Sequence, residues 1–165
     1  MDIGHAPITQ NEISDTEECS MIRMVIVDDF IETAETLSNL YALRDDVEVV
    51  GIVQSGEQLW RILGQTDVHL VSLDIQLGHE NGLELCQLLH KKYPRVFIVM
   101  CSVEETIENR RLALEAGATH FLAKPITMNC VSATVQMCLD HGIGANHAEP
   151  PLTLENLDDL FDALK

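Results

Sequence analysis

The chain has 165 residues, of which 46% are hydrophobic and only 4% are aromatic. This content is enough to bury an aliphatic core, so the composition excludes a wholly disordered chain. The formal net charge is −17 and no basic patch is apparent along the sequence, which argues against nucleic acid and anionic membrane surfaces as partners.

Cysteine usage and the first residues bear on the compartment. The five cysteines are an odd number and contain no CxxC pair, which predicts free thiols rather than a disulfide framework or a zinc site. The N-terminal sequence has neither a basic start nor an apolar run, so it does not resemble a secretion signal. No segment approaches the roughly 18 apolar residues of a membrane span. We therefore expect a cytoplasmic protein with no membrane partner.

The first half of the chain alternates apolar runs with segments of helical spacing. Residues 24–27 (MVIV) form an apolar, β-branched run, and apolar residues then recur at three- and four-residue intervals. The same alternation follows twice more. The pattern predicts strands over 24–27, 47–53 and 68–73, and helices over 30–43, 57–63 and 83–90.

The second half continues the alternation. A fourth apolar run, 96–101 (VFIVMC), predicts a strand, and it is followed by a predicted helix over 104–116 that Gly117 ends. A fifth strand is predicted over 119–123. Thr127 is placed to cap a last helix over 128–138.

Five strand–helix alternations predict an α/β domain whose parallel sheet is covered by helices on both faces. We place this domain at 21–140. Residues 1–20 hold five acidic residues and no Lys or Arg, which predicts an acidic, flexible extension. Residues 141–165 predict a linker and then a short acidic amphipathic helix. That helix is suited to docking on its own domain, to binding a partner or to beginning a further domain, and the sequence does not decide among these.

Polar side chains stand where four of the predicted strands end. Asp28-Asp29 follow the first strand, Asp74 the third, Ser102 the fourth and Lys124 the fifth. The carboxyl ends of parallel strands meet at one edge of the sheet, where such folds bind ligands. Three neighbouring carboxylates repel one another unless a cation lies among them, and an all-oxygen set suits Mg²⁺. The set predicts a site in which Asp74 is the nucleophile toward a phosphoryl group.

These motifs together resemble those of a known family. VDDF at 27–30, LDIQLGHENG at 73–82, MCSVEE at 100–105 and FLAKP at 121–125 are similar to the motifs of response-regulator receiver domains. The resemblance covers about residues 23–139. It implies a flavodoxin-like, three-layer (βα)5 sandwich with strand order 2-1-3-4-5 along the chain numbering. It also implies a phosphorylatable switch of a two-component phosphorelay rather than an enzyme.

The resemblance assigns roles at the strand ends. Asp29 would ligate Mg²⁺ directly, and Asp28 would act mainly through water. Asp74 would be the phosphoacceptor and would also supply a ligand oxygen. The backbone carbonyl of Gln76 would complete the protein's share of the coordination, and Lys124 would contact the phosphoryl group. No other cofactor is implied.

The resemblance also implies a switch. Ser102 would move toward the phosphoryl group after phosphorylation, and Phe121 would occupy the aromatic switch position. The acceptor loop departs from the family because Leu77-Gly78 stands where Met-Pro is common, and Ser102 replaces the commoner Thr. Neither change touches the metal ligands or the acceptor, so we expect a competent receiver domain.

Partners follow from the same resemblance. A sensor histidine kinase or a phosphotransfer protein would donate the phosphoryl group from phospho-His, and a downstream protein or an output domain outside this chain would respond. Receiver domains of this family often form homodimers through their fourth and fifth helices.

Two alternatives have weaker support from the sequence. A phosphohydrolase with an aspartyl nucleophile would need a second acid two residues after Asp74, where this chain has Gln76. A phosphate-independent scaffold with the same fold would be expected to have lost a key residue. The five residues Asp28, Asp29, Asp74, Ser102 and Lys124 are all present.

Overall fold

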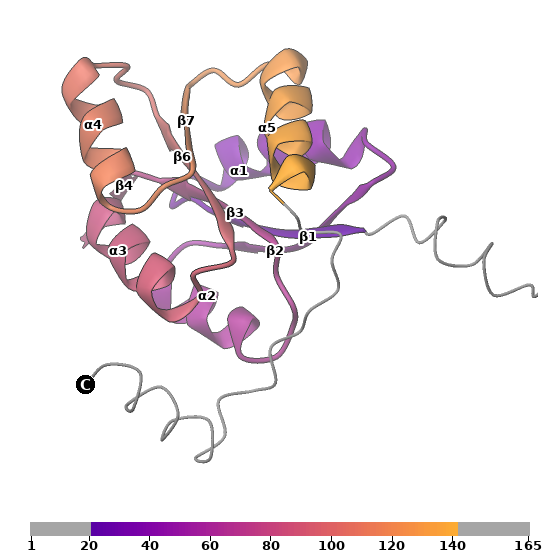
Figure 1. The fold of residues 1–165 in the computed structure, drawn as a ribbon, viewed down its shortest axis with the longest axis horizontal. Coiled ribbons are helices and arrows are strands. Elements are labelled where there is room, and N and C mark those ends of the chain that lie inside the picture. The colour runs from indigo at the N-terminus through magenta and orange to yellow at the C-terminus, as the bar shows by residue number, and fades with distance from the viewer. Residues whose placement is uncertain (1–20, 142–165) are drawn as a thin grey trace, which may run out of the picture.

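The computed structural model describes residues 21–141. The predictions for 1–20 and for the linker and helix after His141 therefore lie outside the described residues. The strands of the central sheet are β1 (Ile22–Val27), β2 (Val47–Val53), β3 (Leu70–Asp74), β6 (Phe97–Ser102) and β7 (His120–Ala123). They are all parallel and lie in the order β2-β1-β3-β6-β7 (Figure 1). With the strands of this sheet counted along the chain, that order is 2-1-3-4-5, which confirms the predicted fold class.

Helices cover both faces of the sheet (Figure 1). They are α1 (Ile31–Ala42), α2 (Gly56–Leu63), α3 (Gly82–Lys92), α4 (Ile107–Glu115) and α5 (Met128–Asp140). One buried cluster joins α2, α3 and α4 to one face of the sheet, and a second joins α1 and α5 to the other. Successive residues of β1 alternate between these clusters, as Val25 and Ile26 illustrate, because neighbouring side chains of a strand point to opposite faces.

Side-chain caps set the start of four helices. Ser55, Asn81, Thr106 and Thr127 each accept a backbone N–H from the first turn that follows. The cap at Thr106 makes α4 begin at Ile107, three residues later than predicted. Residues 104–106 are therefore not helical. Ser102 Oγ accepts the Glu104 N–H at 3.0 Å, and Asn109 Nδ2 donates to the Glu104 carbonyl at 3.1 Å.

A small hairpin that the sequence analysis did not predict follows β3. Its strands are β4 (Gln76–Leu77) and β5 (Glu80–Asn81), and the turn uses Gly78 at φ +60. Gly82 closes the hairpin against β3, where an added Cβ would lie 2.1 Å from the carbonyl oxygen of Asp74. The hairpin therefore needs glycine at Gly82 because a side chain there would collide with backbone.

Within 21–141 no helix is long and apolar enough to cross a membrane.

Candidate functional site

Two adjacent carboxylates stand at the end of β1. Asp28 is 2% exposed, and its Oδ1 accepts the backbone N–H of Phe30 at 2.9 Å, just before α1 begins. Asp29 is exposed to solvent. The chain thus holds one carboxylate in the protein and presents the next one to water.

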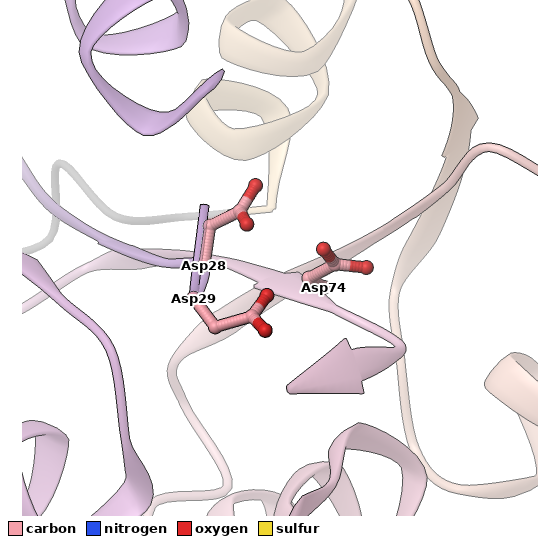
Figure 2. Close-up of side chains that lie close together, drawn as sticks. All are labelled: Asp28, Asp29 and Asp74. Carbon is pink, nitrogen blue, oxygen red and sulfur yellow. The ribbon is translucent and has the colours of Figure 1, made fainter. Parts of the chain in front are cut away.

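Asp74 ends β3, the strand beside β1. Its carboxylate, with those of Asp28 and Asp29, forms a cluster in which one oxygen of each lies within 4.8 Å of the others (Figure 2). The parallel pairing of Val27 with Leu73 brings the acids together, since Asp28 comes directly after Val27 and Asp74 directly after Leu73. An all-carboxylate set of this kind fits a hard cation such as Mg²⁺.

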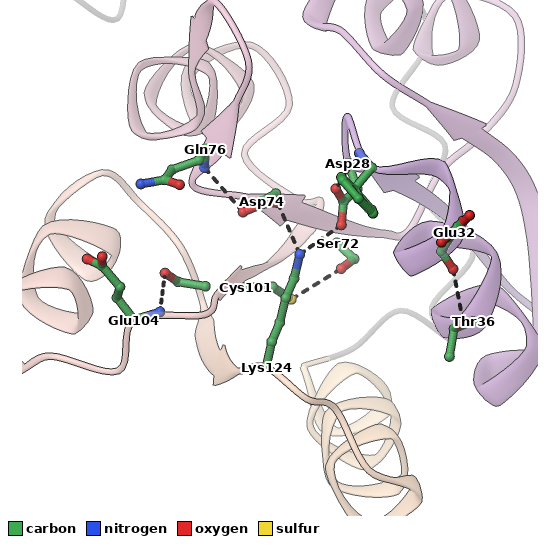
Figure 3. A network of polar contacts seen from close by, with 11 residues as sticks. Asp28, Glu32, Thr36, Ser72, Asp74, Gln76, Cys101, Glu104 and Lys124 are labelled. Carbon is green, nitrogen blue, oxygen red and sulfur yellow. Dashed lines mark hydrogen bonds and ion pairs between the residues drawn. The ribbon is translucent and has the colours of Figure 1, made fainter.

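Lys124 reaches the same cluster from the end of β7. Its Nζ donates to Asp28 Oδ2 at 2.8 Å and to Asp74 Oδ2 at 3.0 Å (Figure 3). Its own backbone N–H donates to the Ser102 carbonyl at 2.8 Å, which fixes the lysine against β6. The ammonium group therefore bridges two of the three carboxylates.

Burial and this bridge act in opposite directions on the ionisation of the site. Burial raises the pKa of Asp74, and the hydrogen bond from Lys124 offsets only part of that effect. Burial alone would lower the pKa of Lys124, but its hydrogen bonds to Asp28 and Asp74 outweigh burial and raise that pKa. The lysine is consequently held as a cation, beside the poorly solvated carboxylate of Asp74.

The remaining predicted residues lie around this centre. Ser102 ends β6, is buried, and uses its Oγ to accept the Glu104 N–H. Gln76 begins the hairpin, and its backbone N–H donates to Asp74 Oδ1 at 3.2 Å (Figure 3). Phe121 is buried in β7 among the residues that pack on the α4 side, and the Arg110 guanidinium carbon lies 5.2 Å from its ring centroid. The structure thus brings the three carboxylates and Lys124 into direct contact range and places Phe121 in the core.

Glu80 has a role that the sequence analysis missed. Its Oε2 accepts the backbone N–H of Gly56 at 2.9 Å, which ties the hairpin to the first turn of α2. The start of a helix offers unpaired N–H groups and a partial positive charge, so a carboxylate is favoured there. The signal in the sequence was the predicted start of a helix after Ser55-Gly56, but nothing in it pointed to Glu80 as the partner.

Comparison with known proteins agrees with this geometry. Residues 24–136 match the family model of the response regulator receiver domain. The chain belongs to this family. The resemblance inferred from the strand-end motifs is thereby confirmed, and the receiver domain is a signalling switch in two-component systems.

Curated relatives of this receiver domain are longer proteins. Over 115 residues it is 30% identical to "Protein-glutamate methylesterase/protein-glutamine glutaminase 3" of Burkholderia thailandensis, a match that covers 69% of this chain and 32% of the relative. Over 139 residues it is 25% identical to "Transcriptional regulatory protein LnrK" of Bacillus subtilis, covering 84% of this chain and 62% of the relative. This chain thus spans about a third to three-fifths of these relatives.

Solved structures show the same fold. A CheY-like response regulator receiver domain protein from Methanospirillum hungatei superimposes with a TM-score of 0.64 at 24% identity, covering 73% of this chain and 95% of that one. At this identity the likeness establishes the fold alone.

Proposed function

We propose that this receiver domain is a Mg²⁺-dependent phosphoacceptor. Asp74 would take a phosphoryl group from a phospho-His of a histidine kinase or of a phosphotransfer protein. The observation that supports this proposal most strongly is the cluster of Asp28, Asp29 and Asp74 within 4.8 Å, in which Lys124 bridges Asp28 and Asp74. Phosphoryl transfer needs negative groups that bind a metal ion and a positive group that binds phosphoryl oxygens. The three acids supply the first, and the ammonium group of Lys124 supplies the second.

Each residue then has a part in the transfer. Asp28, Asp29, Asp74 and the backbone carbonyl of Gln76 would hold the Mg²⁺, which when bound neutralises phosphoryl oxygens. A carboxylate oxygen of Asp74 forms the new P–O bond while the P–N bond of the phosphohistidine breaks and the imidazole nitrogen keeps the electron pair. Lys124, which donates to Asp74 before transfer, donates to a phosphoryl oxygen after it.

Ser102 and Phe121 would carry the response. Ser102 Oγ, which accepts the Glu104 N–H, would turn toward the phosphoryl oxygens and release the segment before α4. Phe121 packs beneath Arg110 of α4, so a rearrangement of that segment reaches the surface formed by α4, β7 and α5. The outcome is a population shift between two packings, and it changes which protein binds this surface.

The partners and the compartment belong to the same proposal. A downstream protein, or an output domain beyond this chain, would read the α4–β7–α5 surface, and a second copy is a further candidate partner there. Cys86, Cys101 and Cys138 are free and buried, and burial raises the pKa of the Cys101 thiol to about 11. Unpaired thiols of this kind suit the reducing cytoplasm, where we place the protein.

Intact mass spectrometry after incubation with acetyl phosphate tests the proposal. We expect a gain of one phosphoryl group that requires Mg²⁺ and is absent in Asp74→Asn. Circular dichroism of the variant would establish that it is folded. A phosphoryl group on the variant would refute the acceptor assignment. A folded wild-type chain that takes up no phosphoryl group and binds neither Mg²⁺ nor beryllofluoride would refute the whole proposal and favour a phosphate-independent scaffold.

A further inference from the structure

At the sheet edge opposite the carboxylates, the ends of α2 and α3 form a surface that we call the α2–α3 patch. It consists of Trp60, Arg61, Lys91, Lys92 and Tyr93. The rings of Trp60 and Tyr93 stack with centroids 6.4 Å apart, and Lys92 Nζ lies 4.8 Å from the Trp60 ring centroid. The two helices thus meet in one basic and aromatic surface, which the sequence conceals because Arg61 lies 30 residues before Lys91.

The charge of this patch stands out in an acidic chain. Five basic side chains of 21–141 outside the patch pair with carboxylates, in the pairs Arg23–Glu48, Arg44–Asp46, Arg110–Glu105, Arg111–Glu108 and Lys124–Asp28. In the patch, Arg61 meets Glu57 only at 3.6 Å, between side chains that are 67% and 84% exposed. An ion pair so exposed contributes little to stability, so the charge of Arg61 is available to a partner.

The described structure ends on the α1–α5 face of the sheet, at the same end of the strands as this patch. The His141 ring packs edge-on against Phe97, with centroids 5.8 Å apart. Phe97 begins β6 and comes just after Tyr93 and Arg95 in the chain, and the Tyr93 carbonyl accepts the N–H of Val96. Residues 142–151 are ten residues, which reach up to about 33 Å when extended. This length is ample for the following segment to lie on the patch.

We propose that the α2–α3 patch docks this chain's own C-terminal segment, residues 152–165. The sequence of the segment places apolar residues at helical spacing among acids, namely Leu154, Leu157, Leu160, Phe161 and Leu164 among Glu155, Asp158, Asp159 and Asp162. Its acids match the Arg and Lys side chains of the patch. Its apolar stripe matches the half-buried Trp60 and Tyr93 and the neighbouring Leu88, which is 49% exposed.

The other apolar surface of the described domain suits this segment less well. Val103, which precedes α4, and Ile107 and Leu114 of α4 are 71%, 90% and 52% exposed. The acids Glu104, Glu105, Glu108 and Glu115 outnumber Arg110 and Arg111 around them, so the surface has the same sign of charge as the segment. Docking on α2 and α3 also leaves the α4–β7–α5 surface free.

Trp60 is the single tryptophan of the chain, which makes it a specific reporter of the docked segment. Quenching of its fluorescence by acrylamide, a neutral quencher, would be measured on the full chain without any phosphodonor. In Leu157→Ser/Phe161→Ser, which removes apolar contacts and keeps the charge, we expect the quenching constant to rise about two-fold because the segment no longer excludes solvent. Val103→Ser/Ile107→Ser, at the start of α4 and in the segment before it, is the matched control and should leave quenching unchanged.

A charge exchange tests the recognition itself. Arg61→Glu/Lys91→Glu should expose Trp60 to the same extent, and combination with Asp158→Lys/Asp159→Lys should restore protection. Lys92 is kept because it contacts the reporter ring. Unchanged quenching in the Leu157→Ser/Phe161→Ser chain, or an effect of the α4 control instead, would overturn the proposal. Protection that grows with protein concentration would also overturn it, in favour of docking by a second copy. Because no phosphorylation is involved, these outcomes are independent of the proposed phosphoacceptor function.

Discussion

Lys124 Nζ donates to Asp74 Oδ2 at 3.0 Å, although 50 residues separate the two in the chain. The same ammonium group also donates to Asp28, so it compensates two carboxylates that are shielded from water. Their side chains are 3% and 14% exposed for Asp28 and Asp74 respectively. The lysine therefore supports the fold of the site as well as any chemistry there.

Lys124→Met tests this double role. Removing the ammonium leaves the acids uncompensated, so we expect a loss of about 2–3 kcal/mol in the free energy of unfolding in Mg²⁺-free buffer. Urea denaturation measures this loss, and added Mg²⁺ should reduce it because a cation again neutralises the acids. Lys91→Met removes the same charge from an exposed position and should cost far less. Equal stability of Lys124→Met and wild type without Mg²⁺ would contradict the compensating role.

The contact between Gly82 and β3 gives a steric prediction. An alanine Cβ at this position would lie 2.1 Å from the Asp74 carbonyl oxygen and 2.6 Å from that of Ile75. Gly82→Ala should therefore destabilise the protein by about 3 kcal/mol and impair the proposed phosphoryl uptake by Asp74, since β3 must shift.

Gly64→Ala is the matched control for that substitution. Gly64 directly follows α2 at φ −76, and the nearest atom to an added Cβ is 3.5 Å away. This variant should be as stable as wild type or slightly more stable. Thermal unfolding of both variants decides the point, and a small effect at Gly82 would show that the hairpin is not held as tightly as described.

Glu80 allows the anchor of the hairpin to be tested separately. Glu80→Ala removes the acceptor for the Gly56 N–H and the negative charge at the start of α2, so stability should fall by about 1 kcal/mol. Glu80→Gln keeps an acceptor oxygen and should lose only part of this. Phosphoryl uptake from acetyl phosphate should slow in the order wild type, Glu80→Gln, Glu80→Ala. The opposite order would exclude an anchoring role.

His69 predicts a pH dependence of stability. Its Nδ1 accepts the Arg23 N–H at 3.0 Å, and burial, together with the Arg23 charge, lowers the pKa of His69, while Asp67 opposes the shift. The unfolded chain takes up a proton near pH 6.5, whereas the folded protein resists until lower pH. Stability should therefore be lost as the pH falls below about 6.5 and should level off beyond the folded pKa.

His69→Asn isolates this contribution. The asparagine Oδ1 can accept the Arg23 N–H in place of the histidine Nδ1, and an amide does not titrate in this range. The slope of unfolding free energy against pH between 7 and 5.5 should become flatter. Burial, assisted by Arg110, also lowers the pKa of His120, so the double variant with His120→Asn should be flatter still. A steeper slope in His69→Asn would show that the sign of the linkage is wrong.

The fold and the centre of the site could be predicted from sequence for one physical reason. Parallel strands bring their carboxyl ends to one edge, so residues as far apart as Asp28 and Lys124 follow from counting strands. The apolar runs of those strands are long enough to be recognised as strands in the sequence. The two-residue strands β4 and β5 are too short for any periodicity, and the hairpin was therefore missed.

The other misses depend on side-chain geometry. The predicted helix 104–116 began too early because Glu104 and Glu105 are good helix formers, whereas the hydroxyls of Ser102 and Thr106 hold the chain in another conformation. The strand predicted from residue 68 begins at Leu70. The bond from Gly56 to Glu80 spans 24 residues and has no sequence pattern of its own.

The order of the strands has a consequence for when the site forms during synthesis and folding. Asp28, Asp74, Ser102 and Lys124 stand at the ends of four strands, and Lys124 directly follows β7, the edge strand that is synthesised last among the five of this sheet. A nascent chain without β7, or a partly unfolded one in which β7 has detached, lacks the cation that compensates the acids. Only a fully assembled sheet presents the complete constellation. If Asp74 is the phosphoacceptor, as we propose, molecules in which β7 is detached would take up phosphate poorly, so that phosphorylation would report on correct folding.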